Sequence, residues 1–487
     1  MKPLNRQFLS TKSYPTKIMQ FGSGNFLRGF IDWQIEHLNK TTPLNAGISI
    51  IRPRPVNYND SLNLNDQDGL YTTLVRGLNE QGEVVEDIQV IECVNEEIPI
   101  YEAFEQYLAL ATNPELKIIF SNTTEAGIEF ISSDKLTDAP AKAFPAKLTQ
   151  WLFKRFKHFN GSAESGLMII PCELIDYNGE KLKEIVLQYS TLWDLGADFE
   201  SWLHSANHFC STLVDRIVPG FPYGEEEKLQ DKLGYADDFL VAAEYFHFLV
   251  IQGPESLNQL LCLDNTSLNI RVVEDIYPYK QRKVAILNGA HTALVPLAYM
   301  AGIDSVGEAM NDALFENYIH NIIFDEIIPT LDLPKDELQG FALDVIKRFK
   351  NPYIHHLLLS IALNSMTKVE TRILPQLCKY VETYNKVPNL MAHAIAAQIY
   401  LYSGMRDGQT IALSDNPKWL ELMRTGWQAF NQGTQSLEAL VVDVLSAKWQ
   451  WQRDLTEITG LVALVNHILV EFLNNGVRDT LAKALEE

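Results

Sequence analysis

The stretch that decides the fold and points to the chemistry reads Lys283-Val-Ala-Ile-Leu-Asn288-Gly-Ala-His291-Thr-Ala-Leu-Val-Pro-Leu297. Its apolar residues and its length predict a helix. At about 100° per residue, Asn288 lies about 140° and His291 about 80° from Lys283, so all three side chains project from one side. A lysine, an amide and an imidazole that converge can accept a proton, polarise a carbonyl and orient it, as hydride transfer between an alcohol and a nicotinamide requires. The same spacing also fits an ordinary apolar helix with a snorkelling lysine, a capped asparagine and a satisfied core histidine.

The composition is that of a folded protein with two substantial domains. The chain has 487 residues, more than one ordinary domain contains. Hydrophobic residues make up 46% and charged residues 21%, as is typical of globular proteins. It carries 62 acidic against 40 basic residues, a net charge of -22. That charge repels polyanions, so nucleic acid is not an expected partner. An anionic substrate would require a local cluster of cations.

Cysteine usage and the N-terminal sequence bear on the cellular compartment. The five cysteines include no CxxC pair, which predicts reduced thiols in a cytoplasmic protein. The sequence has no HExxH or paired CxxC spacing, so we predict no metal site. It has no signal-peptide core and no apolar run of about 18 residues, so we expect no membrane partner. We expect a monomer or a small homo-oligomer.

Residues 17–35 follow the pattern of a strand, a glycine turn and an amphipathic helix. The first glycine permits the tight turn, the second lets the backbone approach a pyrophosphate, and the helix N-terminus offers N–H groups to it. Many other turns between a strand and a helix also contain two glycines. We predict that a dinucleotide binds to this turn, through Phe21, Gly22, Ser23, Gly24, Asn25 and Phe26.

Arg52 follows the next predicted strand, Gly47–Ile51. Dinucleotide folds commonly place there an acidic residue that binds the adenosine ribose. An arginine could stack on adenine or bind a 2′-phosphate, so the residue alone leans towards NADP. We expect Arg52 to contact the cofactor.

A further predicted strand, Lys117–Phe120, leads to Asn122 and Glu125. Ligands of an open α/β sheet bind at the carboxyl ends of its strands, so we expect both side chains to face the cofactor or the substrate. A polar cap on the following helix is the alternative. Residues 67–75 and 87–94 predict a hairpin inserted in the same domain.

The predicted architecture is an N-terminal Rossmann-type α/β domain, 1–276, and an all-helical C-terminal domain, 277–487. Asn269–Val273 is expected to be the last strand and Tyr277–Tyr279 the linker, because the sequence beyond Lys283 shows helical spacing nearly throughout.

A helix is predicted over His355–Met366, and Lys368 and Arg372 follow it. Four residues apart, they share one face of a helix. Two cations in a chain of net charge -22 suit a carboxylate clamp with a bidentate arginine. A solvated helix edge is the alternative.

The pattern Lys283-x4-Asn288-x2-His291 and the segment Ser211–Pro219 resemble the signatures of the mannitol dehydrogenase family, the long-chain polyol-specific dehydrogenases. The similarity extends over essentially the whole chain, through Gln20–Gly22, Ser121–Gly127 and Pro171–Gly179. The resemblance implies a Rossmann-type domain followed by a helical domain resembling that of 6-phosphogluconate dehydrogenase. It also implies that the Gly22 turn binds NAD despite Arg52, and that Arg348, in a stretch similar to a family motif, contacts the substrate.

Within that family the chain looks like the members that act on hexuronates. This implies the reduction of D-tagaturonate to D-altronate by NADH in hexuronate catabolism, with Lys283 as acid and base, Asn288 polarising the oxygen and His291 orienting it. A fructuronate (mannonate) reductase and a mannitol-type polyol dehydrogenase would keep the same motifs. A decarboxylating enzyme of the 6-phosphogluconate type has a similar lysine, asparagine and histidine. A nucleotide-sensing protein without turnover is the alternative from another class.

The chain departs from the family pattern at Leu174. Mannitol dehydrogenases have an asparagine there that helps to hold the substrate oxygen. Glu173 or Asn178 could replace it, or the substrate could bind in a different position, and the sequence does not decide between these alternatives. We include Asn178 among the expected substrate-binding residues.

Overall fold

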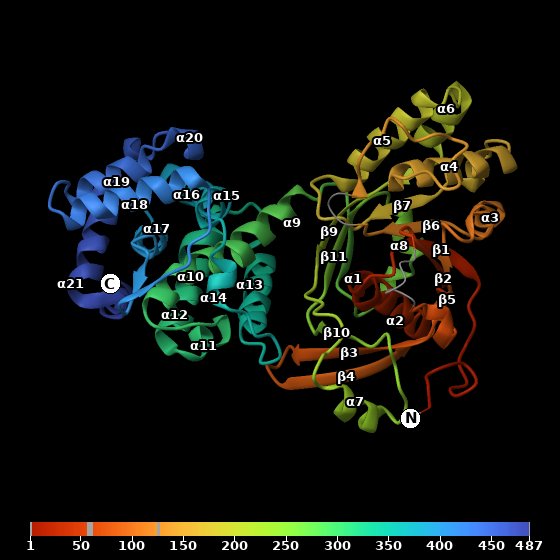
Figure 1. The fold of residues 1–487 in the computed structure, drawn as a ribbon, viewed down its shortest axis with the longest axis horizontal. Helices are drawn as coiled ribbons and strands as arrows, with labels where there is room; N and C mark the ends of the chain where they lie inside the picture. The colour runs from red at the N-terminus through yellow and green to blue at the C-terminus, as the bar shows by residue number, and fades with distance from the viewer. Residues whose placement is uncertain (1, 56–61, 124–126, 487) are drawn as a thin grey trace. The chain divides into compact units, whose positions relative to one another are not determined.

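The computed structural model describes residues 2–55, 62–123 and 127–486 (Figure 1). The chain divides into two compact units, Met1–Gly77 with Val84–Ile276, and Leu78–Glu83 with Tyr277–Glu487. The first unit contains a parallel sheet and the second is built almost entirely of helices. The predicted fold class, a Rossmann-type domain followed by a helical domain, is confirmed.

The main sheet of the first unit has six parallel strands in the order β5-β2-β1-β6-β7-β8. Their bounds are β1 Thr16–Phe21, β2 Gly47–Arg52, β5 Val94–Pro99, β6 Ile118–Ser121, β7 Met168–Pro171 and β8 His208–Phe209. The order reverses between β1 and β6, and in such sheets the ligand crevice lies at this switch, at the carboxyl ends of the strands.

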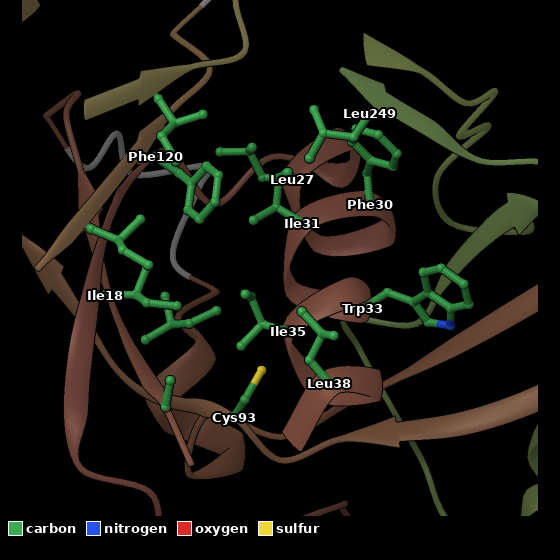
Figure 2. Close-up of a cluster of buried hydrophobic side chains, with 14 of the residues drawn as sticks. Ile18, Leu27, Phe30, Ile31, Trp33, Ile35, Leu38, Cys93, Phe120 and Leu249 are labelled. Carbon is green, nitrogen blue, oxygen red and sulfur yellow. The ribbon is translucent and has the colours of Figure 1, made fainter. Parts of the chain in front are cut away.

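Helices cover both faces of this sheet. One face packs against α3 Phe104–Ala109, α4 Phe144–His158, α5 Asn178–Leu192 and α6 Ala197–Ser205. The other packs against a continuous helix made of α1 Asn25–Leu27, the π-helical segment η1 Arg28–Asp32 and α2 Trp33–Thr41. Figure 2 shows Leu27, Ile31 and Ile35 of this helix pointing towards the β1 and β6 side chains. This apolar stripe fixes the helix and thereby the turn that precedes it.

Two three-stranded sheets complete the first unit. One has the order β10-β3-β4 and contains the predicted hairpin, and the other has the order β12-β11-β9. Their bounds are β3 Tyr71–Leu78, β4 Val84–Ile91, β10 Val241–Glu244, β9 Ser211–Asp215, β11 Phe248–Gln252 and β12 Ile270–Val273, with α7 Glu226–Leu233 and α8 Ser256–Leu260 beside them.

In the second unit the apolar helix α17 packs against α10 and α21. The helices are α9 Tyr277–Arg282, η7 Lys283–Gly289, α10 Ala290–Met300, α11 Val306–Asn311, α12 Ala313–Asn321, η8 Ile322–Ile327, α13 Lys335–Phe349, α14 Leu358–Ile361, α15 Ser365–Arg372, α16 Leu374–Tyr384, α17 Asn389–Leu401, α18 Pro417–Asn431, α19 Leu437–Leu445, α20 Lys448–Trp451 and α21 Leu461–Glu486. A two-stranded ribbon of β13 Met405–Arg406 and β14 Gln409–Thr410 interrupts them. No helix in the described ranges is long and apolar enough to cross a membrane.

Two local predictions about the second unit are wrong. Tyr277–Tyr279 is the first turn of helix α9 and not a linker. The helix expected over His355–Met366 is two short helices, α14 and the start of α15, separated at Asn364. Asn364 has a φ of +53°, a left-handed conformation that ends one helix and precedes the next.

Candidate active site

The turn after β1 has the geometry of a dinucleotide-binding turn. Gly22 has a φ of +109°, and a Cβ there would lie 3.1 Å from the Asn122 carbonyl oxygen, so only glycine fits. Gly24 and Asn25 are exposed, and a Cβ on Gly24 would meet no atom within 4 Å. The turn therefore leaves open space beside the first N–H groups of the helix, as a pyrophosphate requires.

The other residues expected in this turn differ in exposure. Ser23 and Phe26 are partly buried, and Phe26 packs against Phe30. The Phe21 side chain lies in the sheet core, with its ring centroid 4.8 Å from that of Phe144. Phe21 can therefore meet a ligand through its backbone at the strand end but not through its ring.

Arg28 holds the turn from inside the protein. Its buried guanidinium donates to the Ser23 carbonyl oxygen at 3.0 Å and to Asn25 Oδ1 at 2.7 Å. It also contacts the Phe239 carbonyl oxygen and lies over the Tyr71 ring. Arg28 is buried and is therefore not an ordinary surface residue of the first helical turn.

The carboxyl ends of β6 and β7 are joined by buried hydrogen bonds. The Glu173 carboxylate accepts from Ser121 Oγ, Thr123 N and Thr123 Oγ1, each at 3.0 Å. Burial raises the pKa of Glu173, while these donors lower it. Asn122 donates from Nδ2 to the Cys172 carbonyl oxygen at 2.7 Å. Asn122 thus lies at the strand ends as expected, while Glu125 lies outside the described residues.

Arg52 ends β2 and forms an ion pair with a buried carboxylate. Its Nε lies 2.8 Å from Glu97 Oε1, and the Glu97 side chain is fully buried. The same carboxylate accepts from the Leu64 N–H at 2.9 Å. Because Glu97 compensates the guanidinium charge, Arg52 does not present the unpaired cation that would favour a 2′-phosphate.

Asn178 has a structural position. It is fully buried, and its Nδ2 donates to the carbonyl oxygens of Pro171 and Glu173 and to Thr212 Oγ1. Its Oδ1 accepts from the Thr212 N–H at 2.9 Å. With donor and acceptor both used, Asn178 is not available to a substrate, which corrects the expectation from the sequence. Leu174 is 68% exposed.

In the second unit, Lys283 and Asn288 lie on a π-helical segment between α9 and α10. Its side chains are buried at Ala285, Ile286 and Leu287 but only partly buried at Lys283 and Asn288. A π-helix bonds residues five apart, so it brings Lys283 and Asn288 closer to one line than the 100° spacing of an α-helix would. That the Lys283 and Asn288 side chains act on one substrate atom stays a prediction.

Two contacts position this π-helical segment. Arg282 donates from its buried guanidinium to Glu337 of α13 at 2.7 Å and lies over the Phe341 ring. At the other end, a Cβ on Gly289 would lie 3.1 Å from the Arg372 carbonyl oxygen. The missing side chain of Gly289 thus allows α15 to approach the segment closely.

His291 is surrounded by aromatic rings and cations. Its ring stacks on Phe349, with centroids 4.0 Å apart and planes at 13°, and meets the edge of His356 at 5.5 Å. Burial holds the pKa of His291 well below its usual value, with His356, Arg348, Arg372 and Lys368 adding to the effect. The imidazole is therefore neutral near pH 7 and can donate or accept a hydrogen bond.

The cations named in the sequence lie around this histidine. Lys368 and Arg372 come from the same helix, α15, and Arg348 ends α13. Lys368 donates to the Ile361 carbonyl oxygen at 2.6 Å, and burial lowers the pKa of both Lys368 and Arg372. In the part of the chain that the structure describes, no carboxylate forms an ion pair with Arg372. The group is suited to bind an anion.

Phe349 and His356 were not predicted as site residues. Phe349 directly follows Arg348, and His356 is held by a hydrogen bond from Val306 N to its carbonyl oxygen at 3.0 Å. The adjacent His355 and His356 were the available signal in the sequence. Among the residues that the structure describes, no group of three His, Cys, Asp or Glu side chains could hold a metal ion.

The comparisons with known proteins cover both units of the chain. Models of the mannitol dehydrogenase Rossmann domain and C-terminal domain match residues 16–265 and 275–473. The altronate oxidoreductase of Yersinia enterocolitica serotype O:8 / biotype 1B is 53% identical over 482 residues, 99% of this chain and 99% of the relative. That of Klebsiella pneumoniae subsp. pneumoniae is 54% identical over 479 residues, 98% of this chain and 99% of the relative.

Solved structures share the fold. A D-sorbitol dehydrogenase in substrate-free form has a TM-score of 0.78 at 19% identity, over 98% of this chain and 100% of that one. Pseudomonas fluorescens mannitol 2-dehydrogenase, in a ternary complex with NAD and D-mannitol, has a TM-score of 0.65 at 20% identity, over 100% of both chains. Both domain models and the full-length relatives lead to one conclusion: the chain belongs to the mannitol dehydrogenase family.

Proposed function

We propose that this protein interconverts D-tagaturonate and D-altronate, with NAD(H) as the hydride carrier. The observation that carries the proposal is the group of cations around His291, close to the segment of Lys283 and Asn288, in a chain of net charge -22. A neutral polyol does not require such a group, whereas a sugar acid does. The relatives that are 53% identical over their full length carry the name altronate oxidoreductase.

The first unit suits the dinucleotide. The open space at Gly24 and the N–H groups at the start of the helix would receive the pyrophosphate. The Arg52–Glu97 ion pair favours NAD over NADP. When bound, the nicotinamide supplies or accepts the hydride.

The second unit supplies the groups for proton transfer. In the oxidation of altronate, the unprotonated Lys283 amine accepts the hydroxyl proton while the hydrogen on the carbinol carbon leaves as hydride. In reduction, the Lys283 ammonium returns that proton to the oxygen. Asn288 donates a hydrogen bond to the same oxygen, and neutral His291 orients it.

The substrate carboxylate is assigned to Arg372, with Lys368 and Arg348 beside it. A bidentate arginine contact would fix the orientation of the hexuronate as well as its affinity.

A nicotinamide absorbance assay of the purified protein tests the proposal. The substrates are D-tagaturonate, D-fructuronate, D-tagatose and D-fructose, each with NADH and with NADPH. We expect the highest kcat/KM for tagaturonate with NADH. A higher kcat/KM for fructuronate would assign the enzyme to the other hexuronate, and a higher value for a neutral ketose would contradict the carboxylate site.

A further inference from the structure

The N-terminus of α15, the helix that carries Lys368 and Arg372, is capped by a residue from a later part of the chain. Within the residues that the structure describes, the side chain of its own N-cap residue, Asn364, makes no capping hydrogen bond. The hydroxyl of Ser365 donates backwards, to the Ala362 carbonyl oxygen at 2.7 Å. A helix of eight residues is too short to be stable by itself, so its position depends on contacts with the rest of the unit.

Asp415, in the loop between β14 and α18, supplies an acceptor to this helix end. Its Oδ2 atom accepts from the Met366 N–H at 3.0 Å. The Ser414 carbonyl oxygen accepts from the Asn364 N–H at 2.9 Å. Two adjacent residues of one loop thus satisfy backbone donors at the start of α15, where the first N–H groups of a helix lack partners within the helix. The negative charge of Asp415 also interacts favourably with this end of the helix.

Tyr402 fixes the Asp415 carboxylate in turn. Its hydroxyl, directly after α17, donates to the same Oδ2 atom. Tyr402 is buried, and burial together with Asp415 holds the pKa of the hydroxyl well above its usual value, so it stays a donor throughout the pH range of an assay. Hydrogen bonds therefore connect the end of α17, through Asp415, to the first turn of α15.

This cap acts on the part of α15 from which Lys368 projects. Lys368 follows Met366 by two residues, and its ammonium donates to the Ile361 carbonyl oxygen at the end of α14. Burial lowers the pKa of Lys368, Arg372 lowers it further, and Asp415 raises it. The charge of Asp415 is therefore close enough to act on the ammonium. A movement of the first turn of α15 would move Lys368 with it.

The outer side of α15 is held separately. The Glu370 carboxylate accepts from the side-chain amides of Gln450 and Gln452, in and directly after α20. Near the end of the helix, the Arg372 carbonyl oxygen lies against Gly289. Because these contacts remain when Asp415 is changed, loss of the cap should loosen the first turn of α15 without unfolding the unit.

We propose that Asp415 is a positioning residue for substrate recognition: together with Tyr402 it fixes the first turn of α15, and thereby the cations Lys368 and Arg372 that bind the substrate carboxylate. An anionic Asp415 repels that carboxylate, so its contribution comes through the helix and not through a contact with the substrate. The inference rests on the proposed function, which assigns the hexuronate carboxylate to these cations.

Substrate discrimination measures this role. The quantity is the ratio of kcat/KM for D-tagaturonate to kcat/KM for D-tagatose. In Asp415→Ala it should fall by about threefold to tenfold, the effect of one lost helix cap, mainly through KM for tagaturonate. Asp415→Asn keeps an oxygen that can accept from both Met366 and Tyr402, and asparagine caps helices as well as aspartate does, so this variant should restore most of the ratio.

Tyr402→Phe is an independent variant that keeps the buried ring and removes only the hydroxyl. It should lower the same ratio by less than Asp415→Ala does, because Asp415 can still accept from the Met366 N–H. Circular dichroism and Tm establish that each variant is folded.

Ser436→Ala is the matched control for a loss of stability. Ser436 caps α19, with its Oγ accepting from the Ala439 N–H at 3.1 Å. This helix packs against α18 and α21 and carries none of the three cations. The control should lower Tm about as much as Asp415→Ala does, since each removes one helix cap, and should leave the ratio unchanged.

A double-mutant cycle shows whether Asp415 acts through the cations. In a protein with Lys368→Met and Arg372→Met, adding Asp415→Ala should lower the ratio clearly less than it does in the natural protein. An unchanged ratio in Asp415→Ala, or a fall of the same size in both backgrounds, overturns the inference and leaves the proposed function standing. A natural protein that does not prefer tagaturonate to tagatose overturns the proposed function and this inference with it.

Discussion

At the scale of single residues, Lys283 has the role that is easiest to test. Lys283→Ala removes the proton acceptor but no group of the dinucleotide turn. We expect kcat to fall by about a hundredfold or more, the usual contribution of general acid–base catalysis, while the Kd for NADH changes little. Steady-state rates and NADH fluorescence titration measure the two quantities.

Lys379→Ala is the matched control, because Lys379 is an exposed lysine of α16 in the same unit. It should leave both kcat and Kd unchanged. Normal turnover of Lys283→Ala would remove the lysine from the mechanism.

The sequence predicted which side chains lie close together, but not which of them already form hydrogen bonds within the protein. Lys283, Asn288 and His291 could be grouped because helical spacing alone places them on one side. Asn178 could not be assigned correctly, because its partners Pro171 and Thr212 come from other strands and only the folded chain brings them together.

At the scale of elements, the glycine turn tests where the dinucleotide binds. Gly24 has a φ of -66° and no neighbouring atom in the way of a side chain, so Gly24→Ala and Gly24→Val should both fold. Each fills space assigned to the pyrophosphate, and we expect the Kd for NADH to rise in the order glycine, alanine, valine.

Circular dichroism and Tm establish that these variants are folded. An unchanged Kd in folded Gly24→Val would move the cofactor away from this turn.

The predicted strands near residues 17, 47, 117 and 269 follow from apolar periodicity, and the structure has them as β1, β2, β6 and β12. The second unit is built almost entirely of helices, as its helical spacing predicted. The π-helical segments do not follow, because an insertion of one residue in the hydrogen-bond register leaves no mark on apolar spacing. The interruption at Asn364 was missed for a similar reason: apolar residues continue on both sides, and only the backbone conformation of Asn364 separates α14 from α15.

At the scale of the whole molecule, the protein and its proposed substrate both carry negative charge. A chain of net charge -22 repels a hexuronate at long range. Affinity must therefore come from cations within contact distance, where screening and distance no longer weaken them. We propose that Arg348, Lys368 and Arg372, which lie around His291, supply these cations.

The most direct test of this central claim is the specificity of Arg372→Met, a substitution that keeps an apolar stem and removes the charge. The measured quantity is the ratio of kcat/KM for D-tagaturonate to kcat/KM for D-tagatose, with Arg424→Met, in an exposed ion pair of α18, as the control. A charge-assisted contact is worth about 1.5 to 3 kcal/mol, so the ratio should fall by about tenfold to a hundredfold in Arg372→Met, through KM for tagaturonate, and stay constant in the control. A ratio that does not change, with both substrates losing activity equally, would contradict the account and make Arg372 a structural residue.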